Sequence, residues 1–435
     1  PRHRLIFIPT MALPTLPLRH LIVPALALLA STAFAASVHW NPPGLPPAPA
    51  TGPALTQGGY LKPEQGQAML DAALTQFPDR ESWEAYAHHA RTRIQEGAGL
   101  APWPKRTPLN PVLHSRRTYD GYTVENVMFE SIPGYFVTGN LYRPTQSRPS
   151  YAAVLSTHGH YRRIEKREDY DAHARFSPLM QARCATLARM GSVVLSIDMF
   201  GYGDSMQLVG QDAHRQPLAL TLQIWNAMRA VDFLLSLDGV DPKRVAVSGE
   251  SGGGTQSFLL AALDPRIAAS APVVMVSSYF FGGCACESGL PIHRTSDHFV
   301  NNAMIAALAA PRPMLVVSDG KDWTAHVPKI EFPFLQKIYG YYHATSNVTN
   351  VHLAEEGHDY GPSKRAALYV FLAREFGLDL SVVRKADGRF DESKNTFETA
   401  AQLRSFTPEY PIPHHALHEG GAILKVLNSL QTGER

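Results

Sequence analysis

Short apolar segments alternate with amphipathic segments from residue 151 onward. Six apolar runs have the length and composition of buried strands: 152–157, 192–197, 244–249, 267–274, 313–318 and 348–353. Segments with helical spacing lie between them, at 176–190, 217–237 and 252–263. Strands that alternate with helices predict βαβ units and a parallel sheet with helices on both faces.

A different pattern precedes these units. Residues 63–97 carry apolar positions at helical spacing, interrupted by Pro78, which predicts two helices. Between 117 and 143, alternating residues flank the turn signal Pro133-Gly134 and predict an antiparallel meander. The meander and the βαβ units together predict an α/β fold with a mixed, mostly parallel sheet.

The amino-terminal segment has the pattern of an export signal. Arg19 precedes an apolar run at 21–30, and Ala33 and Ala35 form a small-residue cleavage site. The run is shorter than the roughly 20 residues that a membrane-spanning helix needs, so cleavage is favoured over anchoring. We therefore expect translation to start at Met11, and a periplasmic or secreted protein without a membrane span after cleavage.

These patterns predict five segments along the chain. They are a signal peptide at 1–35, a proline-rich linker at 36–62, a helical extension at 63–110, the main α/β domain at 111–385 and a tail at 386–435. The tail has weak periodicity, so it either packs on the domain or stays loose.

The charge balance gives no sign of a nucleic-acid or membrane partner. The chain has 40 basic and 38 acidic side chains, and removing the three arginines of the first 35 residues leaves 37 against 38. A near-neutral protein is not a typical nucleic-acid binder. The charge balance leaves the oligomeric state open.

Three cysteines are present, Cys184, Cys284 and Cys286. An odd number in an exported chain leaves at least one free thiol or an intermolecular bridge, and pairing of Cys184 with either of the others stays open. Metal binding by Cys284 and Cys286 is disfavoured because no second cysteine pair exists. We expect neither a metal ion nor a cofactor.

The most informative motif lies between an apolar strand and a helix. It is Gly249-Glu250-Ser251-Gly252-Gly253, which contains Gly-x-Ser-x-Gly in the strand–turn–helix context of a nucleophile elbow. Such a turn exposes the serine oxygen above the sheet, and the start of the following helix directs backbone N–H groups toward it. Ser251 is therefore predicted to be the nucleophile, and the backbone N–H of Gly252 one oxyanion donor. The alternative is an ordinary structural turn.

A serine nucleophile needs a histidine base and an acid that orients it, in the chain order serine, acid, histidine. His358 follows the last predicted strand, at the edge where this class of fold builds its sites. Asp319 and Asp322 both follow the preceding predicted strand. We favour Asp322 as the acid, because Asp319 lies close enough to the strand to cap a turn. Glu287 and Asp297 are weaker alternatives.

The second oxyanion donor is expected in the loop after the strand at 152–157. We assign it to the backbone N–H of His160, with that of Tyr161 as the alternative, because Gly159 lets the backbone approach a substrate closely. His158 and His160 are not expected to bind a metal ion together, since residues one apart on a strand end point to opposite faces.

These residues resemble those of the acetyl-xylan-esterase-like branch of the bacterial α/β-hydrolases. The resemblance covers about 115–375 and rests on Asp120–Tyr122, Pro133–Pro144, His158-Gly159, Asp198–Ser205, Gly249–Gly253, Gly320–Asp322 and Gly357-His358. Members of the branch typically carry glutamine after the serine, where this chain has Gly252. The resemblance implies the α/β-hydrolase fold, acyl transfer to Ser251 followed by hydrolysis, and no cofactor. It also implies that Ser251, Asp322 and His358 form a triad, with His160 and Gly252 in the oxyanion hole.

The activity implied by the resemblance is removal of small acyl groups, acetyl above all, from a carbohydrate such as xylan. Two other activities stay open: a prolyl-oligopeptidase-like peptidase, and a glucuronoyl-type sugar ester hydrolase in which Arg162 and Arg163 bind a uronate carboxylate. Against the peptidase, only about 80 residues separate the signal from the meander, too few for a β-propeller. A catalytically inactive binding module is the third alternative.

Overall fold

The computed structural model of the chain describes three stretches of residues: 39–43, 61–160 and 173–433. Almost all of them belong to one compact unit, Trp40–Arg435. The predicted signal peptide, including Met11, and most of the predicted linker lie outside the described residues. So do Tyr161, Arg162 and Arg163.

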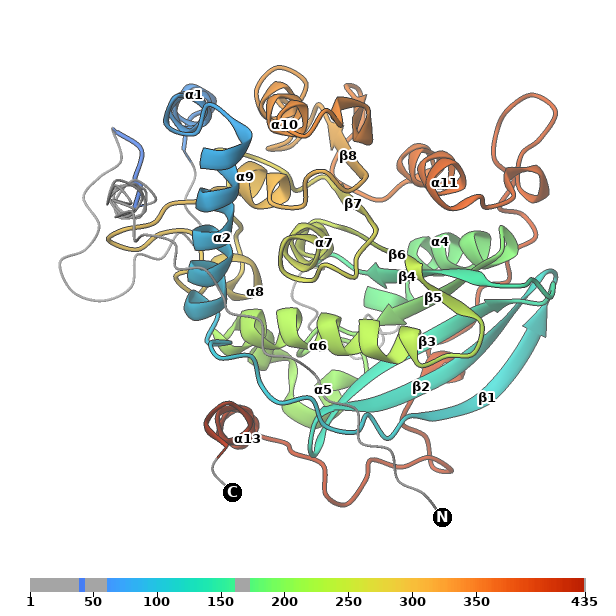
Figure 1. Cartoon of the computed structure of the whole chain (residues 1–435). Helices are drawn as coiled ribbons and strands as arrows, with labels where there is room; N and C mark the ends of the chain where they lie inside the picture. Colours follow the sequence, from blue (N-terminus) through green and yellow to red (C-terminus); the bar gives the residue numbers. More distant parts are fainter. Residues whose placement is uncertain (1–38, 44–60, 161–172, 434–435) are drawn as a thin grey trace, which may run out of the picture. The chain divides into compact units, whose positions relative to one another are not determined.

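Nine strands form one mixed sheet (Figure 1). In the order of their hydrogen bonding, they are β1 (Val112–Tyr119), β2 (Tyr122–Ile132), β3 (Tyr135–Pro144), β5 (Ser192–Ile197), β4 (Tyr151–Thr157), β6 (Val240–Glu250), β7 (Ala269–Val273), β8 (Met314–Asp319) and β9 (Val348–Leu353). Strands β1, β2, β3 and β5 pair antiparallel, and all pairs from β5 to β9 are parallel. The predicted meander and the mostly parallel sheet are confirmed.

Helices cover both faces of the parallel strands (Figure 1). The longer ones are α1 (Pro63–Gln76), α2 (Arg80–Gly97), α4 (Pro178–Arg189), α6 (Leu218–Leu235), α7 (Gly252–Leu263), α10 (Glu331–Gly340), α11 (Pro362–Phe376) and α13 (Gly420–Thr432). The short ones are α5 (Ser205–Val209), α8 (Ala285–Ser288), α9 (Asn302–Ala307), α12 (Ala400–Leu403), η2 (Ala174–Phe176), η3 (Gln211–Arg215), η4 (Thr345–Asn347) and η5 (Leu380–Val382). Side chains of α4 and α11 form one buried apolar cluster with the central strands, and α6 and α7 lie on the opposite face.

The strand order reverses between β4 and β6. The chain leaves β4 toward β5 on one side of it, whereas β6 pairs with its other side. At such a reversal the loops that follow the two strands diverge and leave a crevice beyond the carboxyl ends, where open α/β sheets bind ligands. The segments after β4 and after β6 carry His160 and Ser251, so both lie at this position.

The two predicted amino-terminal helices are present as α1 and α2. Helix α2 begins after Asp79, whose carboxylate accepts a hydrogen bond from the backbone N–H of Ser82 at 2.9 Å and so caps the helix. Its apolar face carries the buried rings of Trp83 and Tyr86. The Tyr86 hydroxyl donates to the carbonyl of Phe299 at 2.7 Å, which ties this helix to the segment that follows β7.

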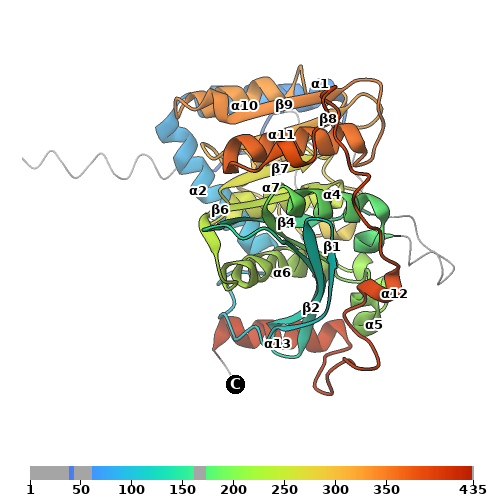
Figure 2. The same ribbon diagram turned by 90° about the vertical axis from the view of Figure 1, so that its right-hand side faces the viewer.

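The tail packs on the meander. The side-chain amides of Asn126 and Asn140 donate to the carbonyls of Arg404 and Leu403 at 2.7 and 3.0 Å, and the backbone N–H of Ser405 donates to Asp204 at 2.6 Å. Figure 2 shows α12 beside the antiparallel strands. The tail therefore supplies the cover that these long strands need on one face.

A buried ion network lies beneath the tail. Arg175, fully buried, donates to Asp204 at 2.5 Å, and its Nε lies 2.8 Å from Asp198. Asp198 also accepts from the hydroxyl of Thr138 at 2.7 Å. A Cβ on Gly203 would lie 1.9 Å from this carboxylate, so the loop after β5 has room only for glycine there.

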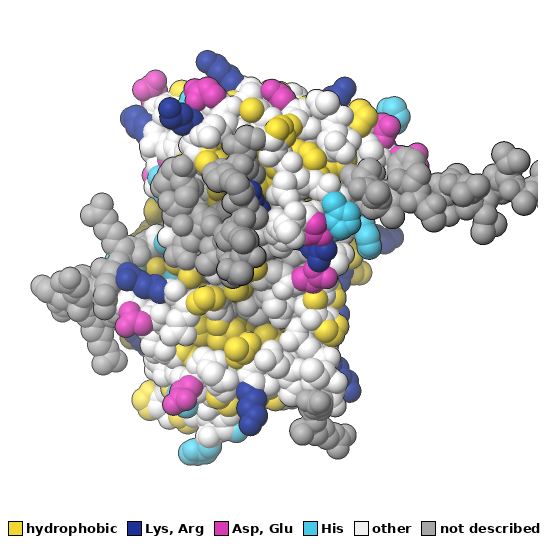
Figure 3. All heavy atoms as spheres, turned by 90° about the vertical axis from the view of Figure 1, so that its left-hand side faces the viewer, with side chains coloured by type: hydrophobic (Ala, Val, Ile, Leu, Met, Phe, Trp, Pro, Cys, Tyr) yellow, Lys and Arg dark blue, Asp and Glu magenta, His cyan; other side chains and the backbone are white. Residues whose placement is uncertain are grey.

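Among the described residues, no helix has both the length and the apolar character needed to cross a bilayer. On the described part of the face shown in Figure 3, acidic and basic side chains are interspersed rather than separated into patches.

Candidate active site

Ser251 occupies a sharp turn between β6 and α7. Its backbone lies at φ 55° and ψ −123°, a conformation that few non-glycine residues adopt. The residues two positions to either side must be small: a Cβ on Gly249 would lie 2.1 Å from the hydroxyl of Thr157, and one on Gly253 would lie 2.8 Å from the carbonyl of His158. The turn has the strained backbone and the close packing of a nucleophile elbow.

Asp322 and His358 are in direct contact. Nδ1 of His358 donates a hydrogen bond to Oδ2 of Asp322 at 2.6 Å. The other oxygen, Oδ1, accepts from the backbone N–H and the hydroxyl of Thr324 at 2.6 and 2.5 Å. The Asp322 side chain is 3% exposed and that of His358 is 32% exposed. The carboxylate of Asp322 is thus fixed and buried, and its bond at Nδ1 leaves Nε2 of His358 as the ring nitrogen that can accept a proton.

Asp319 lies beside Asp322 but has other partners. It is fully buried, its Oδ1 accepts from the backbone N–H of Lys321 at 3.1 Å, and its Oδ2 lies 3.6 Å from the ammonium of Lys364. Burial and the Asp322 carboxylate raise the pKa of Asp319 to about 6, although the backbone N–H of Lys321 and the ammonium of Lys364 act to lower it. Asp319 therefore packs behind Asp322, and Asp322 is the one that contacts His358.

Lys364, at the start of α11, holds the loop that carries His358. Its buried ammonium donates to the carbonyl of Gly357 at 2.6 Å and to the carboxylates of Asp359 and Glu356 at 2.8 and 3.4 Å. These contacts hold the residues that precede and follow His358 in the sequence. Lys364 is a positioning residue that the sequence pattern did not single out.

The strand directions bring the three predicted triad residues to one edge. Ser251 follows β6, Asp322 follows β8 and His358 follows β9. Because β6 to β9 are parallel, their carboxyl ends meet at the same edge of the sheet. Glu287 and Asp297, the weaker alternatives for the acid, lie elsewhere: Glu287 is beside His160 and Asp297 pairs with Arg93.

Glu250, the residue before the nucleophile, connects the elbow to the loop after β4. Its Oε1 accepts from the backbone N–H of Gly159 at 2.9 Å, and its Oε2 accepts from Arg183 at 3.0 Å. Arg183 also donates to the carbonyl of Thr157 at 2.8 Å. This buried ion pair holds the residues next to His160, whose backbone N–H is the predicted oxyanion donor. The sequence analysis did not single out Glu250 or Arg183. Only Glu250 has a local signal, as the acidic residue at the x position of Gly-x-Ser.

We expect the Glu250→Ala protein to lose about 10²-fold in kcat toward an ester, with little change in KM, because a small shift of the oxyanion loop misplaces its donors. Glu250→Gln can still accept from Gly159 and is expected to retain more of the kcat, although Arg183 then lacks a counter-charge. Steady-state kinetics of both proteins test this, with Glu125→Ala on β2 as the control. A wild-type kcat in Glu250→Ala would contradict it.

The imidazole of His160 lies against the residue that follows the nucleophile. A Cβ on Gly252 would lie 2.3 Å from Cε1 of His160, so no side chain fits at position 252 while the ring is there. This contact places the side chain of His160 next to the predicted oxyanion donor at Gly252.

His158 and His160 point to different surroundings, as expected. Nδ1 of His158 donates to the carbonyl of Gly159 at 2.8 Å, and its Nε2 accepts from the backbone N–H of Met199 at 3.1 Å. Burial lowers the pKa of His158 to about 3, so its ring is neutral. Nε2 of His160 instead lies 2.8 Å from Sγ of Cys286. His158 thus links the ends of β4 and β5.

A group of sulfur and nitrogen atoms surrounds His160. All three cysteines are free thiols, and Cys184 lies apart in the core beside Ser156. Cys284 and Cys286 face His160, together with His214. Although burial opposes it, the carboxylate of Glu287 raises the pKa of His160 to about 9. No second cysteine pair lies beside Cys284 and Cys286, but two histidines from distant segments do.

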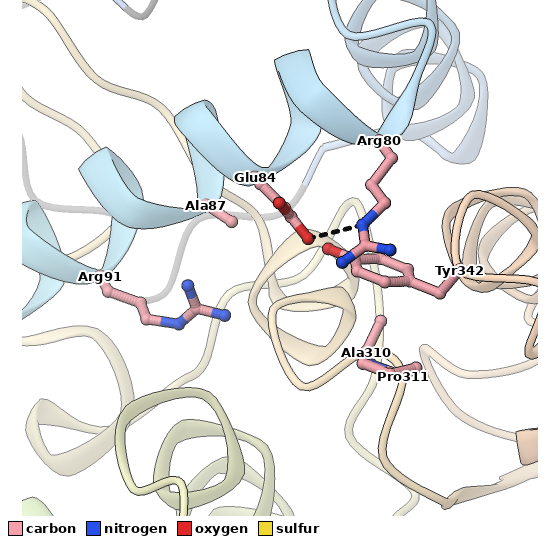
Figure 4. A pocket seen from close by; sticks show the side chains of 7 residues that line it. All are labelled: Arg80, Glu84, Ala87, Arg91, Ala310, Pro311 and Tyr342. Atoms are coloured by element: carbon pink, nitrogen blue, oxygen red, sulfur yellow. Dashed lines mark hydrogen bonds and ion pairs between the residues drawn. The ribbon is translucent and has the colours of Figure 1, made fainter.

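A surface pocket of about 390 Å³ lies away from these residues (Figure 4). It is lined by Arg80, Glu84, Ala87, Arg91, Ala310, Pro311 and Tyr342. The last three precede β8 and β9, so the pocket lies at the amino edge of the sheet. Arg80 and Glu84 pair with each other at 2.8 Å. The pocket is therefore separate from the edge that carries Ser251, Asp322 and His358.

The sheet, its helices and the serine turn at its carboxyl edge define an α/β-hydrolase fold. Comparison with known proteins gives the family. The family model for acetyl xylan esterase matches residues 105–281, which include Ser251 and end before Asp322. The solved structure of methylesterase BT1017 is 39% identical and superimposes with a TM-score of 0.77, covering 86% of this chain and 82% of its own. The chain belongs to the acetyl-xylan-esterase-like branch of the α/β-hydrolases, which places it among the carboxylic ester hydrolases.

Two further proteins are more distant. The putative hydrolase YtaP of Bacillus subtilis (strain 168) is 29% identical over 150 residues, which are 32% of this chain and 46% of that protein. The match thus spans about half the length of this curated relative. A glucuronoyl esterase from Solibacter usitatus is 15% identical with a TM-score of 0.50, covering 69% of this chain and 94% of its own, and shares the fold.

Proposed function

We propose that this protein hydrolyses small esters carried by a carbohydrate, with Ser251 as nucleophile, His358 as base and Asp322 as the acid that orients His358. The observation that carries the proposal is the 2.6 Å hydrogen bond from His358 to the buried Asp322, at the sheet edge that also carries the strained Ser251. Family membership supports ester chemistry.

The reaction proceeds in two acyl transfers. His358 removes the proton from the hydroxyl of Ser251 as its oxygen attacks the ester carbonyl, and Asp322 stabilises the imidazolium that forms. The backbone N–H groups of Gly252 and His160 donate to the oxyanion. His358 then passes its proton to the leaving alcohol. A water molecule, deprotonated by His358, hydrolyses the acyl-enzyme and regenerates Ser251.

We propose acetyl groups on a polysaccharide such as xylan as the substrate. A methyl ester of a uronate is a second candidate, because a methylesterase is 39% identical over most of both chains. The two substrates differ in where the small group lies: acetate leaves from the acyl-enzyme in the first case, and methanol is the first product in the second. The released product therefore distinguishes them.

The test is a product profile of the purified protein on acetylated xylan and on methyl-esterified pectin. Release of acetate or of methanol supports the proposal, and the product identifies which of the two esters is hydrolysed. A fluorophosphonate probe, which labels activated serines, is expected to label the protein once, and mass spectrometry is expected to locate the label on Ser251. No product and no labelling would contradict the proposal. Cleavage of dipeptide anilides instead would favour the peptidase.

We also propose that the protein is exported and that residues 1–35 are removed, from the pattern around Arg19 and Ala33 to Ala35. Expression of the full chain in a bacterium, followed by N-terminal sequencing of the protein from the periplasm, tests this. A protein that stays in the cytoplasm with an intact amino terminus would contradict it.

A further inference from the structure

Four side chains with sulfur or nitrogen donor atoms converge beside the nucleophile turn. They are His160, His214, Cys284 and Cys286, and their donor atoms all lie within 4.8 Å of one another. They come from three segments that are distant in sequence: the loop after β4, the short helix η3 and the turn at α8. These side chains come together only in the folded chain, because no single segment carries all four.

Both histidines present the same ring nitrogen to the group. Nδ1 of His214 donates to the carbonyl of Phe200 at 2.7 Å, so its Nε2 carries the lone pair. His214 is 4% exposed, and among the described residues its Nε2 has no hydrogen-bond partner. Nδ1 of His160 lies 3.5 Å from the carboxylate of Glu287, and its Nε2 lies 2.8 Å from Sγ of Cys286. An oxygen at Nδ1 that fixes Nε2 toward a common centre is the usual outer shell of a metal-binding histidine.

The turn that carries the two thiols is built around Glu287. Oε2 of Glu287 accepts from the backbone N–H groups of Gly283 and Cys284 at 2.9 and 3.0 Å. At Gly282, φ is 130° and a Cβ would lie 2.4 Å from Cβ of Glu287, so the turn closes tightly there. Only Ala285 lies between Cys284 and Cys286 in the sequence, and this tight turn directs both of their thiols toward His160. Glu287 thus shapes the thiol turn and orients one imidazole.

We propose that His160, His214, Cys284 and Cys286 bind a zinc ion with tetrahedral geometry. Two thiolates and two imidazoles are a donor set that selects Zn²⁺ over harder cations such as Mg²⁺ or Ca²⁺. Zinc bonds of about 2.0–2.3 Å place ligand atoms roughly 3.3–3.8 Å apart. To close around the ion, the donor atoms that lie up to 4.8 Å apart move together, and the 2.8 Å pair of His160 and Cys286 opens slightly.

The ion has a structural role, because four protein ligands leave no position for water or substrate. It joins the loop after β4 to η3 and to the turn at α8, all near Ser251. The ring of His160, held as a ligand, stays against Gly252, while Glu250 holds the backbone of Gly159 in the same loop. Hydrolysis itself takes place at Ser251 and does not involve the ion.

The test measures metal content, which does not depend on any esterase activity. The purified protein is stripped with a chelator under reducing conditions, reloaded with Zn²⁺, desalted and analysed by mass spectrometry for zinc. We expect about one zinc per chain in the wild type and in Cys184→Ser, a control that removes a buried thiol outside the group. We expect Cys284→Ser and His214→Gln to retain less than a tenth of that zinc after the same desalting.

Reloading the wild type with Co²⁺ gives a second readout that needs no variant. We expect the intense visible bands of tetrahedral Co²⁺ together with a thiolate-to-cobalt charge-transfer band. Either of two results would overturn the proposal: a wild type that retains no zinc and shows no such bands, or zinc that persists unchanged in folded Cys284→Ser and His214→Gln. A thiol titration of the denatured, chelator-treated protein that finds one free thiol per chain would also overturn it, because any disulfide among the three cysteines takes up Cys284 or Cys286.

Discussion

The Ser251→Ala protein is expected to lose about 10⁶-fold in kcat toward short esters, the loss seen when the nucleophile of a triad is removed. The acyl-enzyme forms on the side-chain oxygen of Ser251, which alanine lacks. The turn with φ 55° directs only this side chain above the sheet, so no neighbouring residue can replace it as the nucleophile. Alanine has the same steric limits as serine in this turn, so the fold and the melting temperature are expected to change little.

Measurement of kcat on p-nitrophenyl acetate, with the melting temperature beside it, tests this result. Ser236→Ala, at the end of α6, is the control for a serine whose hydroxyl only caps a helix, through its bond to Phe233 at 2.7 Å. Fluorophosphonate labelling is expected to disappear in Ser251→Ala and to persist in the control. Activity that survives in Ser251→Ala would place the nucleophile elsewhere.

Asp322→Asn is expected to lower kcat about 10⁴-fold. An asparagine offers Nδ1 of His358 either an amide N–H or a weaker acceptor, so the ring loses the tautomer and the charge stabilisation that a base needs. The neighbouring Asp319→Asn is expected to lower kcat less than about 10-fold, because Asp319 contacts Lys321 and Lys364 rather than His358.

The comparison of these two variants is informative because they differ by three positions in one loop and remove the same charge. Each is compared with the wild type for kcat and for melting temperature. A larger loss of kcat in Asp319→Asn than in Asp322→Asn, at equal stability, would mean that the acid has been assigned to the wrong carboxylate. Equal losses in both would point to the charge of the loop rather than to the hydrogen bond with His358.

Periodicity and turn signals predict the strands, the helices around the elbow and the order of the site residues, but not helix α13 of the tail. The strand and helix positions around the elbow follow from apolar runs and from the glycines that the turn requires, such as Gly249 and Gly253. The preference for Asp322 over Asp319 followed from distance along the loop, and the structure puts Asp322 against His358. Local geometry decides each of these features, so the sequence carries a local signal for them.

The contacts that support the site have no such signal. Glu250 and Arg183 are 67 residues apart, and His214 meets the thiols of Cys284 and Cys286 only after η3 and α8 have packed together. Periodicity shows which face of an element is buried, but it does not show which loop tips meet. The same limit explains why His160 was predicted for its backbone N–H, while its side chain lies between Gly252 and the thiols.

The packing of the tail on Asp204 also sets when the protein can finish folding during its synthesis. The backbone N–H of Ser405 that completes the buried ion network is 201 residues downstream of Asp204. At roughly 5–20 residues per second, a ribosome needs about 10–40 s to add those residues. Throughout that interval the long antiparallel strands lack one of their covers, so the nascent chain stays incompletely folded until the residues around Ser405 have emerged.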